Sequence, residues 1–114
     1  MENIMYNELV CRGYSVDVGV VDIFETDADG KRKKVSCEID FVVNKGVKKY
    51  YIQSALTLES AQKEKTELRP LLGVKDFFRK IIVTKSGMKP WLDETGILHL
   101  GLYDFLLNPA ALDL

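Results

Sequence analysis

Apolar residues recur along the chain with two different spacings, which indicate helices in some stretches and strands in others. Residues 2–12 carry apolar side chains at helical spacing, Met5 and Leu9 among them, and Gly13 supplies a residue at which a helix can end in the left-handed conformation. Residues 15–25 are rich in valine and isoleucine, which are typical of strands. The chain is therefore expected to open with a helix followed by a strand.

A polar stretch at residues 26–34 separates the first strand from the next. Asp29 and Gly30 favour a tight turn there, and the basic residues that follow keep the turn in water. Valine-rich and aromatic-rich stretches then predict strands at residues 35–44 and 47–56. The short connection between these two strands predicts a hairpin.

The hairpin register decides which polar side chains meet. With residues 45–46 as the turn, Tyr51 would lie opposite Asp40, and Gln53 would lie opposite Glu38. Alternation along the two strands then predicts a polar face and a core face. The polar face would hold Glu38, Asp40, Tyr51 and Gln53, and the core face Cys37, Ile39, Phe41, Val43, Tyr50 and Ile52.

The second half of the chain returns to helical composition. Residues 57–72 are rich in Glu, Lys, Gln, Ala and Leu, which predicts a helix that is interrupted or ends near Pro70. Strands are expected at residues 80–85 and 97–100, and a closing helix at 102–107. The predicted fold class is α/β, with the element order αβββαββα and a mixed central sheet.

Length and charge limit the class of protein. A chain of 114 residues has room for one domain, and its 46% hydrophobic and 29% charged residues permit a buried core. A net charge of −1 excludes a uniformly basic nucleic-acid-binding domain. The apolar runs are too short to cross a bilayer, and no signal-peptide pattern surrounds Glu2, so we expect a cytoplasmic protein without membrane contact.

Several common ligand sites find no support in the sequence. Cys11 and Cys37 are too far apart for a Cys-x-x-Cys motif and are expected to be buried free thiols. His99 lies in an apolar run and is expected to be structural. No Gly-x-x-x-x-Gly-Lys-Ser/Thr motif is present, so ATP hydrolysis by this chain is not expected.

The polar face of the hairpin is the strongest candidate for chemistry. Two carboxylates on one side of a strand repel each other unless a cation, a hydrogen-bond donor or solvent reduces the repulsion. In catalytic sites a divalent metal ion has this role. Glu38 and Asp40 with the amide of Gln53 would suit Mg²⁺. The structural alternative is a solvated sheet face with a cross-strand hydrogen bond.

A series of segments along the chain resembles a known family. The segments are 2–9, 12–14, 38–42, 51–53, 71–72, 80–83 and 96–108. In order and spacing they resemble the C-terminal domain of unknown function of bacterial AAA-type ATPases, which is similar to the PD-(D/E)XK restriction-endonuclease-like superfamily. The resemblance implies that residues 1–114 form one three-layer nuclease-like domain, the C-terminal part of a larger ATPase, with the ATPase domain as its partner.

The resemblance also implies positions for a catalytic site. The helix Glu and the strand Asp of the superfamily pattern correspond to Glu8 and Asp40. The (D/E)-x-K tripeptide of that pattern corresponds to Gln53-Ser54-Ala55. In the superfamily these residues hold magnesium and activate water. Here Gln53 brings no charge, and Ala55 cannot replace the lysine, although Lys63 or Lys65 could reach toward the site.

The preferred hypothesis is a non-catalytic or weakly metal-binding, degraded nuclease-like module that acts as an interaction or regulatory domain of an AAA-type ATPase. One alternative is a magnesium-dependent DNA endonuclease that uses Glu8, Asp40 and Gln53 with Glu38. Another is a dimeric protein-interaction domain without a ligand, for which Trp91, expected in an exposed loop, would mark a contact surface.

Nucleic acid is a further expected partner. A basic run of four residues at the turn could contact phosphates, or it could only keep the turn soluble. The run consists of Lys31, Arg32, Lys33 and Lys34.

Overall fold

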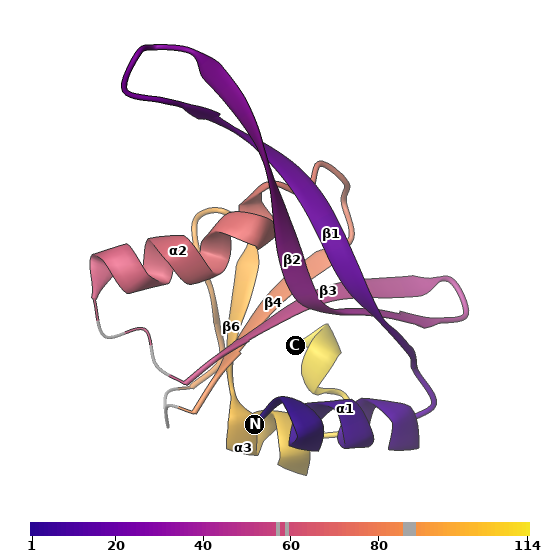
Figure 1. Ribbon diagram of the computed structural model, residues 1–114. Coiled ribbons are helices and arrows are strands. Elements are labelled where there is room, and N and C mark those ends of the chain that lie inside the picture. The colour runs from indigo at the N-terminus through magenta and orange to yellow at the C-terminus, as the bar shows by residue number, and fades with distance from the viewer. Residues whose placement is uncertain (57, 59, 86–88) are drawn as a thin grey trace.

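A six-stranded sheet lies between two helical layers (Figure 1). The structure is a computed structural model that describes residues 1–56, 58, 60–85 and 89–114. In chain order the elements are α1 (Glu2–Cys11), β1 (Ser15–Thr26), β2 (Arg32–Lys45), β3 (Lys48–Ala55), α2 (Ala61–Leu72), β4 (Arg79–Thr84), β5 (Trp91–Leu92), β6 (Ile97–Gly101), α3 (Leu102–Leu107) and the short 3-10 helix η1 (Ala111–Asp113).

The sheet is mixed, with strand order β1-β2-β3-β4-β6-β5. β1, β2 and β3 form an antiparallel meander, β3, β4 and β6 run parallel, and β5 pairs antiparallel with β6 at the edge. A parallel pair needs a long crossover connection, and α2 belongs to the one between β3 and β4. The predicted mixed α/β class is confirmed.

The predicted element order is confirmed except near Trp91 and at the start of α2. Trp91 lies in the two-residue strand β5, and its side chain is 42% exposed, so the expected loop is wrong. α2 begins at Ala61 because the hydroxyl of Ser60 caps it, accepting from the Lys63 amide at 3.1 Å. Thr57, the predicted first residue, lies outside the described residues. Pro70 does not end the helix.

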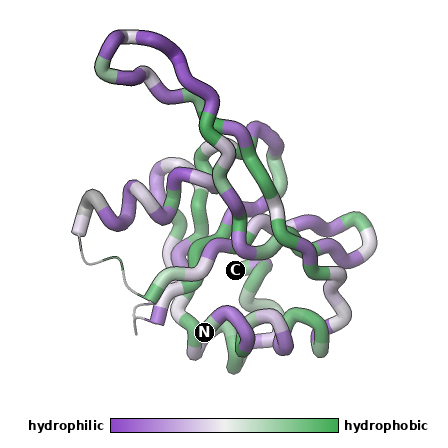
Figure 2. Tube along the Cα trace, in the orientation of Figure 1, coloured by the Kyte–Doolittle hydropathy of each residue, from purple (hydrophilic) through white to green (hydrophobic). Residues whose placement is uncertain are grey.

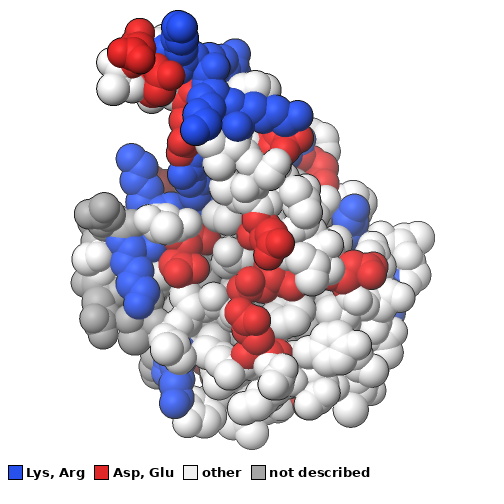
Figure 3. All heavy atoms as spheres, in the orientation of Figure 1, with Lys and Arg blue, Asp and Glu red and all other residues white. Residues whose placement is uncertain are grey.

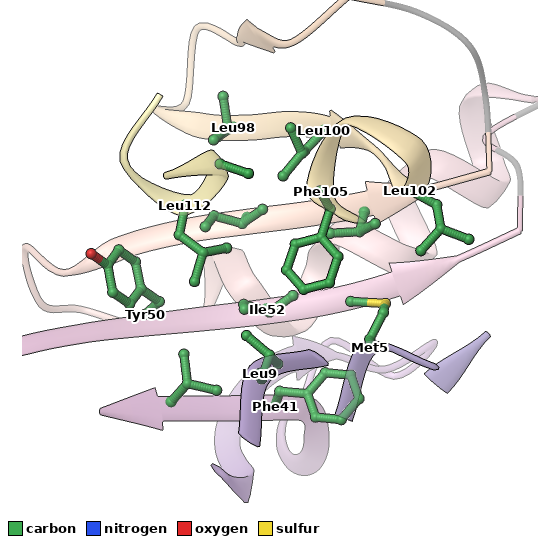
Figure 4. Packing of buried hydrophobic residues seen from close by; sticks show 14 residues of the cluster. Met5, Leu9, Phe41, Tyr50, Ile52, Leu98, Leu100, Leu102, Phe105 and Leu112 are labelled. Atoms are coloured by element: carbon green, nitrogen blue, oxygen red, sulfur yellow. The ribbon is translucent and has the colours of Figure 1, made fainter. Parts of the chain in front are cut away.

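Each helical layer covers its own core on the sheet. One core lies under α1, α3 and η1, where Phe105 and Met5 point toward Ile52 of β3 (Figure 4). Its buried members are Met5, Leu9, Phe41, Val43, Tyr50, Ile52, Ile81, Val83, Leu98, Leu100, Leu102, Phe105, Ala111 and Leu112. The other core lies under α2 and consists of Ile39, Ala55, Leu68, Leu71, Ile82 and Ile97. The central strands of the sheet are therefore buried on both faces.

The hairpin between β2 and β3 has a different register from the predicted one. Lys45 pairs with Lys48, so Gly46 and Val47 make the turn, and the positive φ of Gly46 suits it. The pairing is shifted by two residues, and Tyr51 lies opposite Val42 instead of Asp40. The predicted pairing of Gln53 with Glu38 is wrong for the same reason.

A β-bulge in β2 explains a second departure from the prediction. Asp17 lies opposite Val42 and Gly19 lies opposite Ile39, so two steps along β1 match three along β2. The extra residue breaks the alternation of faces. Ile39 therefore packs under α2 while Phe41 packs under α1, and the predicted common face of these two side chains is wrong. A Cβ on Gly19 would lie 2.5 Å from the Val42 side chain, which explains the glycine.

Beyond the bulge, β1 and β2 leave the body of the sheet as a twisted two-stranded arm, residues 19–39 (Figure 1). The arm rests against α2 through an ion pair between Glu25 and Arg69. At its hydrophilic tip (Figure 2), Asp27 accepts hydrogen bonds from the amides of Asp29 and Lys31 at 3.0 and 2.8 Å. A turn is confirmed here, but it spans only residues 27–31, because Thr26 and residues 32–34 pair as strands. The Asx-type hydrogen bonds of Asp27 explain its tightness.

Arg12 fastens the end of α1 to the end of α3. Its Nη2 donates to the carbonyl oxygens of Phe105 and Leu106 at 2.5 and 3.3 Å, and its guanidinium lies 4.8 Å from the centre of the Phe105 ring. Glu8 accepts from Nε at 2.9 Å and balances the charge. The two helices are thereby held in one layer.

His99 closes the hairpin of β5 and β6. Its ring is 7% exposed, stacks on Trp91 at 4.1 Å, and shares a 2.7 Å hydrogen bond with the carboxylate of Asp93. The structural role predicted for His99 fits these contacts. Burial by itself raises the pKa of Asp93, but hydrogen bonds from Thr95, His99 and Ile97 outweigh it and lower that pKa.

Within the described part of the chain, no helix has both the length and the apolar character needed to cross a bilayer.

The core under α3 predicts a sharp contrast between two residues of that helix. Phe105 is fully buried whereas Leu107 is 82% exposed, so Phe105→Ala should lower the free energy of unfolding by about 3–5 kcal/mol. Leu107→Ala should change it by less than about 0.5 kcal/mol. Urea unfolding of the two variants measures the contrast, and equal losses would contradict this packing.

The lowered pKa of Asp93 predicts an acid-dependent loss of stability. The contribution is complete above the unfolded pKa of about 3.9 and is lost as the pH falls through the lower folded value. Asp93→Asn should therefore lose less stability than wild type between pH 5 and pH 2.5, measured by urea unfolding. Glu94→Gln, an exposed change in the same turn, is the control and should keep the wild-type dependence.

Candidate functional site

Asp40 lies where β2 separates from β3. The last pair of the two strands is Phe41 with Ile52, and from Ile39 back to Arg32 β2 pairs with β1 alone. Strands that part in this way expose backbone donors and acceptors that need new partners. The side chains around Asp40 supply them.

Gln53 and Asp40 are joined by hydrogen bonds in place of the missing strand pairing. The amide of Asp40 donates to Oε1 of Gln53 at 2.9 Å. In return, Oδ2 of Asp40 accepts from both the amide and the hydroxyl of Ser54, each at 2.9 Å. Gln53 is only 7% exposed, so the predicted placement of its side chain on an open polar face is wrong. These bonds hold β2 to β3.

A second carboxylate approaches the same hydroxyl from α1. Oε1 of Glu2 lies 3.4 Å from Oγ of Ser54, which also bonds Asp40. An open hollow of about 440 Å³ lies beside them. Its lining residues are Met1, Glu2, Asn3, Ser54, Ala55 and Leu56. Glu2 is thus the acid of α1 that comes near Asp40 through Ser54.

Glu8 and Glu38 are engaged or placed elsewhere. Glu8 is bonded to Arg12 in the layer of α1 and α3. Glu38 is exposed on the arm and lies opposite Val20 of β1, beyond the last β2–β3 pair. In the described part of the chain, no hydrogen bond or ion pair links either residue to Asp40.

The third position of the tripeptide is part of the core under α2. Ala55 is 7% exposed there and lies opposite Thr84 of β4. Lys63 and Lys65, the candidate substitutes for the missing lysine, are exposed on α2. Within the described residues, no contact joins either lysine to Asp40.

The predicted magnesium ligands do not fit a metal ion as they lie. Oε1 of Gln53 and Oδ2 of Asp40 already accept hydrogen bonds from the protein, and Glu38 is on the arm. Among the residues with described positions, no three His, Cys, Asp or Glu side chains gather closely enough to hold a metal. The arrangement fastens strands, and no reaction step follows from it.

The basic run at the start of β2 is partly engaged. Arg32 lies over the ring of Phe24 at 4.3 Å, and Lys34 pairs with Asp22 at 3.3 Å. Hydrogen bonds from Ser36 and Lys34 lower the pKa of Asp22. Lys31 and Lys33 are exposed. Figure 3 shows basic side chains along the arm and over α2, with acidic ones at the arm's tip and in a band across the body.

Sequence reasoning missed Glu2 and Ser54. Ser54 stands inside the tripeptide, where the family pattern leaves its identity open, and it bonds Asp40 next to the bulge. Glu2 lies on the same helix as Glu8, and the family pattern points to Glu8. One feature of the sequence indicates that Glu8 is engaged elsewhere. Arg12 lies four residues after Glu8 on the same helix, so the two side chains can form an ion pair.

Comparison with known proteins gives one informative relative. An uncharacterized protein of Haemophilus influenzae is 37% identical over 108 residues, which are 95% of this chain and 23% of that protein. The chain therefore spans about a quarter of the relative's length. No protein-family model matches the chain. No solved structure matches it either.

The hydrogen bond between Asp40 and Gln53 predicts a structural cost. Gln53→Ala would leave the Asp40 amide without its partner, so the free energy of unfolding should fall by about 1–3 kcal/mol. Urea unfolding of Gln53→Ala and Glu38→Ala measures the difference. Because Glu38 is exposed, Glu38→Ala should change the free energy of unfolding by less than about 0.5 kcal/mol. Equal effects would mean that the bond does not hold the strands.

Proposed function

We propose that this domain is a non-catalytic, nuclease-like module that serves an AAA-type ATPase as an interaction or regulatory domain. The observation that carries the proposal is the use of the Asp40 and Gln53 oxygens to join β2 and β3. An oxygen that accepts hydrogen bonds from the protein has fewer lone pairs left for a metal or a reacting water. Ala55, buried under α2, supplies no lysine to assist a nucleophile.

The architecture supports the nuclease-like part of the proposal. An antiparallel meander followed by a parallel crossover through α2, with α1 on one side and α2 on the other, agrees with the order that the family resemblance implies. The relative is about four times as long as the matched segment, which supports a role as one part of a larger protein.

A magnesium-dependent nuclease is the second candidate, and one observation favours it. Glu2 and Asp40 both approach the Ser54 hydroxyl beside an open hollow. Two carboxylates and a hydroxyl are oxygen ligands of the kind that magnesium prefers. This candidate replaces Glu8 by Glu2 and needs Asp40 to release its bonds to Ser54.

Contact with nucleic acid is part of the proposal. The exposed side chains of Lys31 and Lys33 are available for phosphate contacts, whereas Arg32 and Lys34 have partners within the arm.

Metal titration with plasmid nicking tests the proposal. The wild type should show neither Mg²⁺ or Mn²⁺ binding by calorimetry nor metal-dependent nicking. Asp40→Ala should leave both results unchanged while lowering the free energy of unfolding by about 1–3 kcal/mol. Metal-dependent nicking that Asp40→Ala and Glu2→Ala both abolish, but Glu38→Ala does not, would replace the proposal by the second candidate.

A further inference from the structure

The two edges of the sheet differ in length and in protection. β5, at one edge, has two residues, whereas β1, at the other, has twelve. An edge strand carries a row of backbone N–H and C=O groups without strand partners, and proteins commonly protect long edges with proline, lysine or a bulge. β1 contains neither proline nor lysine, and the extra residue of the bulge belongs to β2, away from the free edge. The edge at β1 is therefore open to another strand.

The arm has only two strands where it projects from the body (Figure 1). A two-stranded ribbon is marginally stable by itself, and a third strand makes it stable. Every residue of β1 is exposed or half-buried. Val18, Val20 and Phe24 alternate along the strand, so they point to one face, and they are 67%, 69% and 56% exposed. A third strand would supply partners for the backbone groups of β1 and apolar neighbours for these side chains.

The charges of β1 restrict which strand can pair with it. Two of its three acids already have basic partners, since Oδ2 of Asp22 lies 3.3 Å from Nζ of Lys34 and Glu25 pairs with Arg69. Asp17 is the third acid. Like charges directly opposite each other destabilise a strand pair. A partner strand must therefore keep its own acids away from the positions opposite these three.

A second copy of β1 meets this condition in one antiparallel register. Opposite residues of an antiparallel pair point to the same face, so a two-fold axis relating identical strands must pass through a residue position. With the axis at Val20, residues 15–25 of the two copies lie side by side, and no acid faces an acid. Val20 and Phe24 both gain apolar partners. The opposed residues are Val20 with Val20, Val18 with Asp22, Asp17 with Ile23, Val16 with Phe24, and Ser15 with Glu25.

Other positions of the axis are less favourable. An axis at Val21 would place Asp17 opposite Glu25. An axis at Asp22 would place the two copies of that acid opposite each other. An axis at Gly19 would leave the exposed ring of Phe24 without a partner in β1.

We propose that two copies of this chain associate by antiparallel pairing of their β1 strands, centred on Val20, which joins the two sheets into one. The contact uses backbone groups along the edge and the apolar side chains of one face of the arm. It involves neither Asp40 nor Gln53, so it is separate from the role proposed for the domain in an ATPase.

Sedimentation equilibrium across a range of protein concentrations tests the association, and the wild type should form a dimer. Val20 lies opposite Glu38 of its own chain, so Val20→Glu would place four carboxylates in one row across the contact. The dissociation constant of the dimer should rise at least about tenfold. Val47→Glu makes the same change at a 95% exposed site outside β1 and should keep the wild-type constant. Circular dichroism checks that both variants fold.

Disulfide cross-linking tests the register without that variant. Cys11 is exposed, contrary to the buried thiol expected from the sequence, and Cys37 is half-buried, so Cys11→Ser and Cys37→Ser form the background. Val20→Cys should give a cross-linked dimer on mild oxidation, because directly opposite Cβ atoms lie about 4.5–5.5 Å apart. Val18→Cys, on the same face of the same strand, should not, because it would lie opposite Asp22 of the second copy.

Three results would overturn the proposal. The first is a monomer at every concentration, which would leave the edge to a strand of a different polypeptide. The second is an equal dissociation constant for Val20→Glu and Val47→Glu. The third is cross-linking through Val18→Cys but not through Val20→Cys. If Val20→Glu does not fold, the cross-linking result decides.

Discussion

The fold depends on how β2 is held where it leaves β3. At Asp40 the regular strand pairing stops, an extra residue enters β2, and the strand continues outward with only β1 beside it. Without replacement bonds, backbone groups at this branch would be buried and unpaired, which is costly in a low-dielectric interior. Gln53 and Ser54 provide the replacements. Both the arm and the two cores take their positions from this point.

The same branch explains why an amide suits position 53. An acid there would place a charge in a nearly closed environment, where burial opposes ionisation unless a cation balances it. Gln53 supplies an oxygen that accepts from the Asp40 amide without bringing a charge. An amide at this position therefore favours stability of the branch. Ala55 also favours stability. Its small apolar side chain packs under α2, where a lysine would have to extend to solvent.

Sequence reasoning recovered the elements much better than the contacts between them. The helices around Leu9, Leu68 and Phe105 and the main strands followed from hydrophobic spacing and turn residues, which act locally. The hairpin register did not, because Lys45-Gly46 and Gly46-Val47 both suit a two-residue turn. The bulge has no pattern of its own in the sequence, so the burial of Gln53 and the approach of Ser54 to Asp40 could not be foreseen. The candidate residues were thus found in part, while their partners were not.

The position of Leu112 has a consequence for the order of events during synthesis. Its side chain fills the core beside Tyr50 and Leu98 (Figure 4), although it belongs to one of the last residues of this segment to be translated. The arm and the β2–β3 hairpin are local in sequence and can form as they leave the ribosome, but the core under α1 cannot close until η1 has emerged. Until then the apolar faces of β3, β4 and β6 stay open. During this interval we expect the exposed apolar faces of the nascent chain to bind a chaperone.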